Sequence, residues 1–488
     1  MDSLVKLLHY SVYEGLIDFQ DYDYAFNRLN QLLKRKTSYQ AFDPHQTIEE
    51  PIEALLKPLL DEACERGLIK ADTTMQRDLF EGAIMDVLTP HPSALNERFE
   101  SLRMQSPKKA TDDFYHRSLK SNYIKTARIK KNKFYEVSSS YGDIEITINL
   151  SKPEKDPKDI AKATESSSYP KCLLCKENVG YYGHLNHPPR SNHRIIRMPL
   201  NREPFYFQFS PYVYYNEHAI VLHKNHIPME INIKTFKRLF DFIDQFPHYF
   251  LGSNAGLPIV GGSILSHEHY QGGHADFPID RAESFYQIKK DDITYELLHW
   301  PLSVVRMKGR DKDHLINQAE AFRTYFESYS DEDLNLVAKT DQQHNAITPI
   351  LRKEEQGYVL TLALRNNRTD EAYPDGIFHP HPSVQHIKKE NIGLIEVMGL
   401  AILPGRLDKA FDNIAKVLEG KQKSFDGIKR YQAWIEDLKT QMPTSDTRNL
   451  IEQSAGKLFI QGLEDCGIFK QNHAHREKFI AFLNKFLS

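Results

Sequence analysis

The stretch with the densest chemistry is Gly261-Gly262-Ser263-Ile264-Leu265-Ser266-His267-Glu268-His269-Tyr270-Gln271-Gly272-Gly273. Side chains alternate along an extended backbone, so we expect His267, His269 and Gln271 on one face of a strand. The flanking glycine pairs permit close backbone approach to a ligand and help to fit an anion. The alternatives are a polar turn and a metal site that uses both histidines.

Histidine suits a nucleophile that attacks phosphorus. Its unperturbed pKa of about 6.5 makes a neutral ring nitrogen available at pH 7 without a separate base. A glutamine two residues further along the same face adds a hydrogen-bonding group. The stretch therefore indicates group-transfer chemistry on a β-strand.

A second motif is Cys172-Leu173-Leu174-Cys175, whose spacing lets two thiolates meet one Zn²⁺. Two more ligands are needed, and His223, His226 and His267 are the candidates. A redox-active pair and free structural cysteines are the alternatives. The chain has four cysteines in 488 residues, too few for a disulfide framework, so we expect a reducing, cytoplasmic environment.

A third cluster is His379-Pro380-His381, which again places two histidines at i and i+2. No glutamine follows, because Ser383 stands at that position. The prolines favour a fixed loop. We interpret this cluster as a supporting site or a structural loop, with His381 as the rival candidate nucleophile.

The organisation along the chain indicates an α+β protein. Apolar residues recur at helical spacing through the first hundred residues, and the prolines after Thr89 end one such helix. Strict alternation over 143–150 predicts a half-buried strand. The polar, proline-containing segment 151–170 is the clearest candidate linker. Further strands are expected at 206–213, 219–222 and 357–364, one helix ends before Pro247, and three helical segments close the chain.

Composition narrows the classes of function. Lys and Arg number 63 against 66 Asp and Glu, a net charge of −3, which argues against a protein that coats a polyanion. The segment Arg117–Lys133 nevertheless carries seven basic residues and no acid, so it is either a phosphate or nucleic-acid contact or a solvated basic face. The longest uncharged stretch, 245–267, is too rich in glycine, serine and proline to span a membrane, and no targeting signal is expected at the N-terminus.

The motifs together resemble galactose-1-phosphate uridylyltransferase of the second, bacterial class, within the histidine-triad superfamily. The better-studied class carries His-Pro-His-x-Gln and Cys-x-x-Cys, matched here by His267-Glu268-His269-Tyr270-Gln271 and Cys172–Cys175 in the same order. Longer hallmarks of the second class match at 106–111, 207–212, 364–367 and 386–399. The resemblance implies an α+β fold in which two histidine-triad-like antiparallel-sheet units follow a helical N-terminal domain. We expect the domain at 1–150 with a closing β segment, the linker at 151–170, and the units at 171–335 and 340–488.

The resemblance implies roles for the matching residues of this sequence. By that resemblance, His269 is the nucleophile that takes UMP from UDP-glucose and passes it to galactose-1-phosphate. Gln271 would then bind the transferring phosphoryl oxygens. Asn254, Gly261, Gly262 and Ser263 resemble the residues that contact the nucleotide phosphates. The family's zinc ligands map to Cys172, Cys175, His226 and His267, and a metal there would position the nucleophile's loop.

One residue departs from the family pattern. Glu268 stands where the better-studied class has a proline, which predicts loss of the rigid turn and an acid between the histidines. A nucleotide phosphorylase or hydrolase of the same superfamily is the alternative function, and a zinc-stabilised RNA-binding protein is the remote one. We expect no nucleic acid or membrane partner. A homodimer is expected by analogy with the better-studied class.

Overall fold

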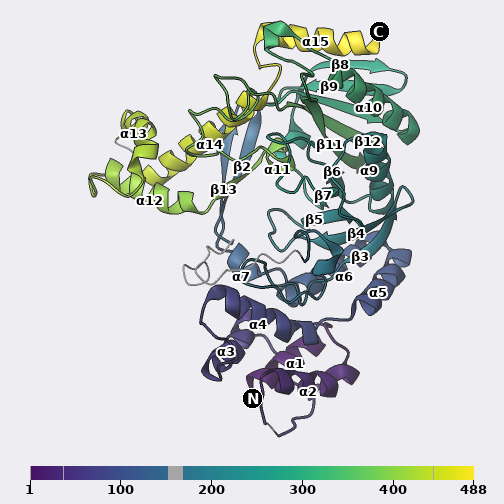
Figure 1. Cartoon of the computed structure of the whole chain (residues 1–488), viewed down its shortest axis with the longest axis vertical. Coiled ribbons are helices and arrows are strands. Elements are labelled where there is room, and N and C mark those ends of the chain that lie inside the picture. The colour runs from purple at the N-terminus through teal and green to yellow at the C-terminus, as the bar shows by residue number, and fades with distance from the viewer. Residues whose placement is uncertain (1, 37, 152–168, 443–444) are drawn as a thin grey trace. The chain divides into compact units, whose positions relative to one another are not determined.

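The computed structural model describes residues 2–36, 38–151, 169–442 and 445–488 (Figure 1). They form two compact units. Unit 1 comprises Met1–Lys131, Ser151–Val213 and Glu217–His226, and unit 2 comprises Asn132–Leu150, Tyr214–Asn216 and Ile227–Ser488. The domain boundaries predicted from the sequence remain a prediction, and residues 152–168 of the predicted linker lie outside the described residues.

Unit 1 begins with the helices that the apolar spacing predicted. Its α-helices are α1 (Ser3–Tyr13), α2 (Tyr22–Leu32), α3 (Ile52–Glu65), α4 (Thr74–Val87), α5 (Pro92–Gln105), α6 (Pro107–Lys120) and α7 (Thr126–Ile129). Side chains cap three of these helices: the Asp2 carboxylate accepts from Leu4 N of α1 at 2.8 Å, and Thr73 and Ser106 cap α4 and α6. Leucines of α1 and α3 fill one shared apolar core.

A three-stranded antiparallel meander completes unit 1: β3 (Ile196–Leu200), β4 (Glu203–Phe209) and β5 (Ala219–His223). The rings of Phe207 and Phe209 lie 5.7 and 5.1 Å from that of Phe114 on α6, so one face of the meander packs on this helix. The prediction that the strand at Tyr206 extends to Val213 was wrong. It ends at Phe209 because Pro211 has no N–H, and the Ser210 hydroxyl bonds the Tyr212 backbone instead.

Unit 2 contains a small sheet made of β1 (Lys133–Ser139), β2 (Gly142–Asn149) and β13 (Leu400–Pro404). β1 and β2 form an antiparallel hairpin, and β13 joins β2 in parallel. Ile144, Ile146 and Ile148 are fully buried, which confirms the strand predicted from alternation. Helix α14 (Thr447–Cys466) crosses β1, and it needs glycine at 456 because a Cβ there would lie 2.2 Å from Val137 Cγ2.

A larger antiparallel sheet in unit 2 carries the histidine strand. Its strand order is β7-β6-β11-β12-β10-β9-β8. The bounds are β6 (Phe250–Gly252), β7 (His269–Gly273), β8 (Ser284–Lys290), β9 (Ile293–Leu298), β10 (Val304–Gly309), β11 (Asn345–Glu354) and β12 (Gly357–Asn366). Helices α9 (Ile233–Gln245) and α10 (Lys312–Glu327) pack on it, and α9 ends before Pro247 as predicted.

The remaining helices of unit 2 follow the sheet strands in sequence: α11 (Leu394–Val397), α12 (Arg406–Leu418), α13 (Gln432–Lys439) and α15 (His473–Leu487). Trp300 is fully buried in the unit 2 core, and its indole N–H donates to the Val397 carbonyl at 3.0 Å. Helices and antiparallel sheets occur in both units, which confirms the α+β class.

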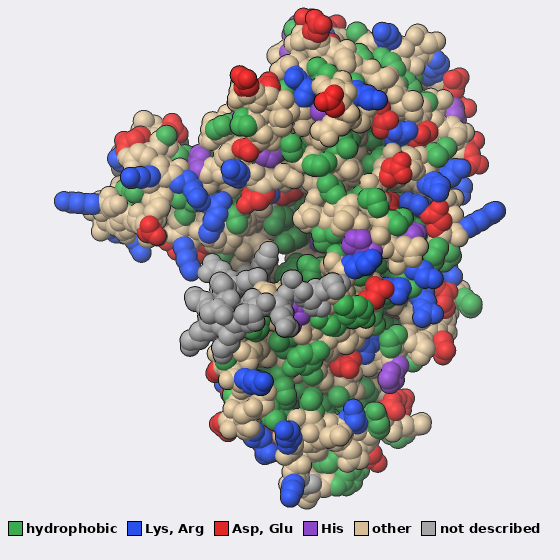
Figure 2. All heavy atoms as spheres, in the orientation of Figure 1, with side chains coloured by type: hydrophobic (Ala, Val, Ile, Leu, Met, Phe, Trp, Pro, Cys, Tyr) green, Lys and Arg blue, Asp and Glu red, His purple; other side chains and the backbone are tan. Residues whose placement is uncertain are grey.

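Charged side chains of both signs are interspersed over the face seen in Figure 2, in keeping with the near-neutral net charge. None of the helices in the described part of the chain is both long and apolar enough to cross a membrane.

Candidate active site

His269 is the first residue of β7 and is only 5% exposed. Its Nδ1 lies 2.7 Å from the backbone carbonyl oxygen of His267. A carbonyl oxygen can only accept, so Nδ1 carries the hydrogen and the lone pair of the neutral ring lies on Nε2. The backbone therefore fixes the tautomer that leaves Nε2 available as a nucleophile.

Burial also sets the charge of this imidazole. Desolvation by burial lowers the pKa of His269 to about 4, although the hydrogen bond to the His267 carbonyl acts in the opposite direction. The ring is therefore neutral at pH 7. A neutral imidazole is the form that can attack an electrophile.

Glu268 points to the opposite side of the strand from His269. Its carboxylate accepts from Arg238 Nη1 at 2.9 Å, from the Tyr270 hydroxyl at 2.7 Å and from Glu230 N at 3.1 Å. Glu268 is 3% exposed and Arg238, on α9, is 6% exposed. A buried ion pair holds this position to α9, and the loss of the rigid turn at Glu268 stays a prediction.

Gln271 lies on β7 opposite Gly252 of β6, and it is only half-buried. Its amide Oε1 is buried and has no hydrogen-bond partner among the described residues. A bound ligand or a water molecule can supply this partner, whichever way the amide oxygen and nitrogen of Gln271 are assigned. His269 and Gln271 stand two residues apart on one face of this strand, as the alternation predicted.

Asn254 and the glycine pair lie in the loop between β6 and β7. Asn254 is 2% exposed, and its Oδ1 accepts from Leu394 N at 2.9 Å. A Cβ on Gly262 would lie 2.6 Å from Asn254 Nδ2, and one on Gly261 would lie 2.3 Å from the Ala255 carbonyl oxygen. Both glycines are therefore required by packing of the loop, whatever they bind. Ser263 is exposed on the same loop.

Unit 1 brings together three of the four predicted metal ligands. The Sγ atoms of Cys172 and Cys175 lie 3.6 Å apart, and Cys175 Sγ lies 3.2 Å from His226 Nδ1. The sulfur separation is far too long for a disulfide, and two thiolates on one tetrahedral zinc lie roughly 3.8 Å apart. These residues fit a metal ion. His223 is engaged elsewhere, since its Nδ1 lies 3.1 Å from the Asn225 carbonyl oxygen.

Asn178 supports the cysteine turn. It is fully buried, and its Nδ2 donates to the carbonyl oxygens of Cys172 and Cys175 at 2.9 and 2.7 Å. The Leu174 N–H also donates to Cys172 Sγ at 3.4 Å. Backbone and side-chain bonds therefore hold both thiols in place.

His267, the fourth predicted ligand, belongs to unit 2 and is fully buried. Glu268 N, one residue further on, donates to the Ile227 carbonyl oxygen at 2.6 Å. Ile227 directly follows His226 in the chain. A backbone bond thus ties the histidine strand to the segment that carries another predicted ligand.

The His379–His381 cluster forms a structural loop. His381 Nε2 lies 3.0 Å from the Ile377 carbonyl oxygen, and its Nδ1 lies 3.3 Å from Asp465 Oδ1. The ring also stacks on Tyr373 with centroids 4.3 Å apart. Both ring nitrogens of His381 are occupied by structural contacts, unlike Nε2 of His269.

Most basic side chains of the segment Arg117–Lys133 are paired with acids. Five of its seven basic side chains form ion pairs: Arg117 with Asp113, Lys120 with Glu14, Lys125 with Glu81, Arg128 with Asp78 and Lys133 with Asp408. Most of its positive charge is therefore compensated. Both interpretations of the segment, a phosphate or nucleic-acid contact and a solvated basic face, stay predictions.

Sequence reasoning missed Arg238 and Asn178. Arg238 lies 30 residues before Glu268, and no local pattern connects the two. The acid between the two histidines, Glu268, could have indicated a basic partner, because a buried carboxylate requires one. Asn178 follows Cys175 by three residues, and no pattern in the sequence indicated its role.

Comparison with known proteins identifies the chain. Residues 15–228 match the family model described as galactose-1-phosphate uridyl transferase, N-terminal domain, and residues 241–423 match the model of its C-terminal domain. A galactose-1-phosphate uridylyltransferase of Caldanaerobacter subterraneus is 46% identical over 98% of this chain and 96% of its own. The galactose-1-phosphate uridylyltransferase of Clostridium acetobutylicum is 46% identical over 98% of this chain and 98% of its own. That of Bacillus subtilis is 45% identical over 99% of this chain and 97% of its own.

Among solved structures, yeast Ap4A phosphorylase Apa2 superposes with a TM-score of 0.37 at 8% identity, over 74% of this chain and 97% of that chain. A similarity of that size supports no argument about this chain.

The family models and the histidine strand define a nucleotidyltransferase. More particularly, the chain belongs to the galactose-1-phosphate uridylyltransferase family. The family predicted from the sequence motifs is confirmed.

Proposed function

We propose that the chain transfers UMP from UDP-glucose to galactose-1-phosphate through a covalent intermediate on His269. The names of the relatives supply the acceptor and the type of reaction. The observation that carries the role of His269 is the bond from its Nδ1–H to the His267 carbonyl. That bond directs the lone pair to Nε2.

In the first step the Nε2 lone pair attacks the α-phosphorus of UDP-glucose. A P–N bond forms, the P–O bond to the β-phosphate breaks, and glucose-1-phosphate leaves with the electron pair. The ring becomes positively charged when Nε2 is phosphorylated, and the His267 carbonyl stabilises that charge through Nδ1–H. The backbone bond thus orients the nucleophile and stabilises the intermediate.

In the second step a phosphate oxygen of galactose-1-phosphate attacks the same phosphorus. A P–O bond forms and the P–N bond breaks, which yields UDP-galactose and restores neutral His269. Gln271 lies on the same face of β7 and would hydrogen-bond the phosphoryl oxygens as charge shifts among them. The loop of Asn254, Gly261, Gly262 and Ser263 would contact the nucleotide phosphates.

We further propose that zinc is held by Cys172, Cys175, His226 and His267. The three ligand atoms in unit 1 lie within 4.8 Å of one another, which supports this assignment. A bound zinc would fix the loop that precedes the nucleophile and would not itself act on the substrate. A homodimer and a cytoplasmic location are expected from the resemblance alone.

The test is adduct formation with UDP-glucose labelled in the uridylyl phosphate. The wild-type chain should retain an acid-labile label, and His269→Ala should retain none. His381→Ala serves as the matched control and should keep the label, because both its ring nitrogens make structural contacts. Label retained by His269→Ala and lost in His381→Ala would reverse the assignment.

A further inference from the structure

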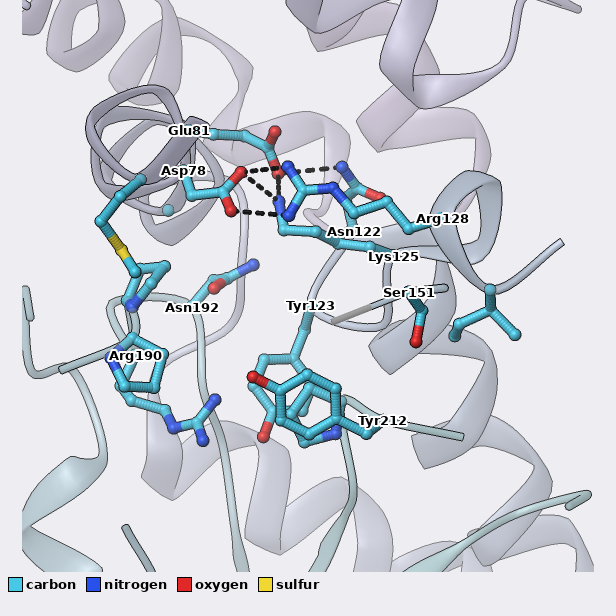
Figure 3. A pocket seen from close by; sticks show the side chains of 16 residues that line it. Asp78, Glu81, Asn122, Tyr123, Lys125, Arg128, Ser151, Arg190, Asn192 and Tyr212 are labelled. Atoms are coloured by element: carbon cyan, nitrogen blue, oxygen red, sulfur yellow. Dashed lines mark hydrogen bonds and ion pairs between the residues drawn. The ribbon is translucent and has the colours of Figure 1, made fainter. Parts of the chain in front are cut away.

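A cavity of about 80 Å³ lies wholly within unit 1 (Figure 3). It is bounded by α4, by the segment between α6 and α7, and by the loops that precede β3 and follow β4. A buried water occupies roughly 10–15 Å³ measured in this way, so the cavity has room for a small molecule or ion. No residue of this cavity has a part in the transfer proposed above.

One wall of the cavity carries charged side chains whose charges cancel. Arg128 donates to both carboxylate oxygens of Asp78 at 2.6 and 2.7 Å, and Lys125 pairs with Glu81. Burial alone would raise the pKa of Asp78, but Lys125 and Arg128 outweigh it and hold that pKa below its usual value. Two acids and two bases therefore compensate one another on this wall.

Arg190 is a further cation without such compensation. It is only 6% exposed, and among the described residues its guanidinium forms no hydrogen bond and no ion pair. The contact that it does make is with the Tyr123 ring, whose centroid lies 5.8 Å from its Cζ. A buried charge that lacks a partner is unfavourable. The cavity thus carries an excess positive charge at Arg190.

Two tyrosines line the cavity together with Arg190. Figure 3 shows the side chains of Tyr123 and Tyr212 on the same side of the cavity as Arg190, with Asn122 beside Glu81 and Arg128 on the charged wall. The guanidinium of Arg190 therefore meets aromatic walls and pairs with no acid among the described lining residues.

We propose that this cavity binds a phosphoryl oxyanion, either inorganic phosphate or the phosphate group of a small hydroxylated ester. The planar guanidinium of Arg190 matches two oxygens of a tetrahedral anion. An anion there neutralises Arg190.

The experiment measures thermal unfolding of the full chain with increasing inorganic phosphate, glycerol phosphate and neutral glycerol at constant ionic strength. Ligand bound to the folded state raises the midpoint in proportion to its affinity. We expect both phosphates to raise it and glycerol to leave it unchanged. Tighter binding of glycerol phosphate than of phosphate identifies an ester site, and equal binding identifies a phosphate site.

Variants then locate the anion. Arg190→Gln should weaken phosphate binding at least about tenfold, since it removes a charge-assisted pair. Arg197→Gln is the matched control: Arg197 lies exposed on β3, so its loss should leave the response intact. His269→Ala should also respond like wild type, which separates this site from the proposed nucleophile.

Two results would overturn the proposal. One is a wild-type chain whose midpoint does not respond to millimolar phosphate, and the other is equal affinity in wild type and Arg190→Gln. If Arg190→Gln does not fold, Arg190→Lys decides the matter, because it keeps the positive charge and loses the planar fork. Phosphate binding should then fall by about threefold or more, and unchanged binding contradicts the site.

Discussion

Arg238 Nη1 donates to Glu268 Oε1 at 2.9 Å, and side-chain exposure of the two residues is 8% and 3%. This pair joins α9 to the residue between the two histidines. In the better-studied class a proline occupies that position. A buried ion pair thus takes the place of a covalently restricted backbone in fixing the nucleophile's strand.

Loss of one member of this pair should be costly. Arg238→Met leaves Glu268 as an uncompensated buried carboxylate, so the free energy of unfolding should fall by about 3–5 kcal/mol in urea denaturation. The double variant Arg238→Met with Glu268→Gln should lose clearly less than the sum of the two single variants. Additive losses would show that the two residues are not coupled.

An exposed ion pair provides the contrast. Lys108 and Asp112 on α6 lie 2.8 Å apart with side chains 53% and 47% exposed. Lys108→Met should change stability by less than about 1 kcal/mol, because solvent screens the pair.

Gly456 tests the packing of α14 on β1. Gly456→Ala should destabilise by about 1–3 kcal/mol, because the new Cβ would meet Val137 Cγ2 at 2.2 Å. This loss should exceed the gain of roughly 1 kcal/mol in helix propensity. Shortening the partner with Val137→Ala should relieve the clash, so the double variant should be more stable than additivity predicts.

Gly462 lies on the same helix and is the matched control. Its added Cβ would lie 3.5 Å from the nearest atom, an ordinary contact. Gly462→Ala should therefore be neutral or slightly stabilising in the same urea experiment. A large loss at Gly462 together with none at Gly456 would contradict the packing described.

His218 predicts a pH dependence of stability. Burial lowers its pKa to about 4 in the folded chain, against about 6.5 in an unfolded one. Unfolding therefore takes up a proton between these values, so the free energy of unfolding should fall as pH falls from about 6.5 to 4. The contribution is about 1.4 kcal/mol per pH unit within that window.

The measurement compares urea denaturation of wild type and His218→Gln from pH 7 to pH 4.5. The glutamine amide can still donate to the Tyr212 carbonyl, which lies 2.9 Å from His218 Nδ1. In the variant, the free energy of unfolding should depend less steeply on pH, because unfolding takes up about one proton fewer. An identical slope in both proteins would show that His218 does not contribute.

The proposed metal site predicts zinc in the purified chain. Elemental analysis should find about one zinc per chain in wild type, and Cys172→Ser should lose it together with part of the thermal stability. Cys64→Ser should retain the metal, because Cys64 lies outside the cluster. Metal absent from wild type prepared without chelators would contradict the assignment.

Local pattern was sufficient to predict part of the fold, but the sequence analysis named no strand at β8, β9, β10 or β11 and no helix at α10. Helical spacing and the proline after Thr89 predicted α1, α2 and α4, and alternation predicted β2. The short helix α13 was missed, because eight residues give little periodicity. The chemistry-bearing residues were also visible, since histidines at i and i+2 and a Cys-x-x-Cys are local patterns.

Relationships between distant residues could not be predicted. The bond from Glu268 to Arg238 and the pairing of Arg128 with Asp78 link segments 30 and 50 residues apart. The unpartnered Arg190 is recognisable only when its surroundings are known. Burial and three-dimensional proximity, not residue type, decide which charges are compensated.

The most direct test is the identity of the uridylylated residue. Wild-type chain is incubated with labelled UDP-glucose, digested at alkaline pH and sequenced by mass spectrometry. We expect one UMP group on His269, with the label discharged to UDP-galactose on addition of galactose-1-phosphate. UMP on any other residue, or no adduct in a chain that still turns over substrate, would contradict it.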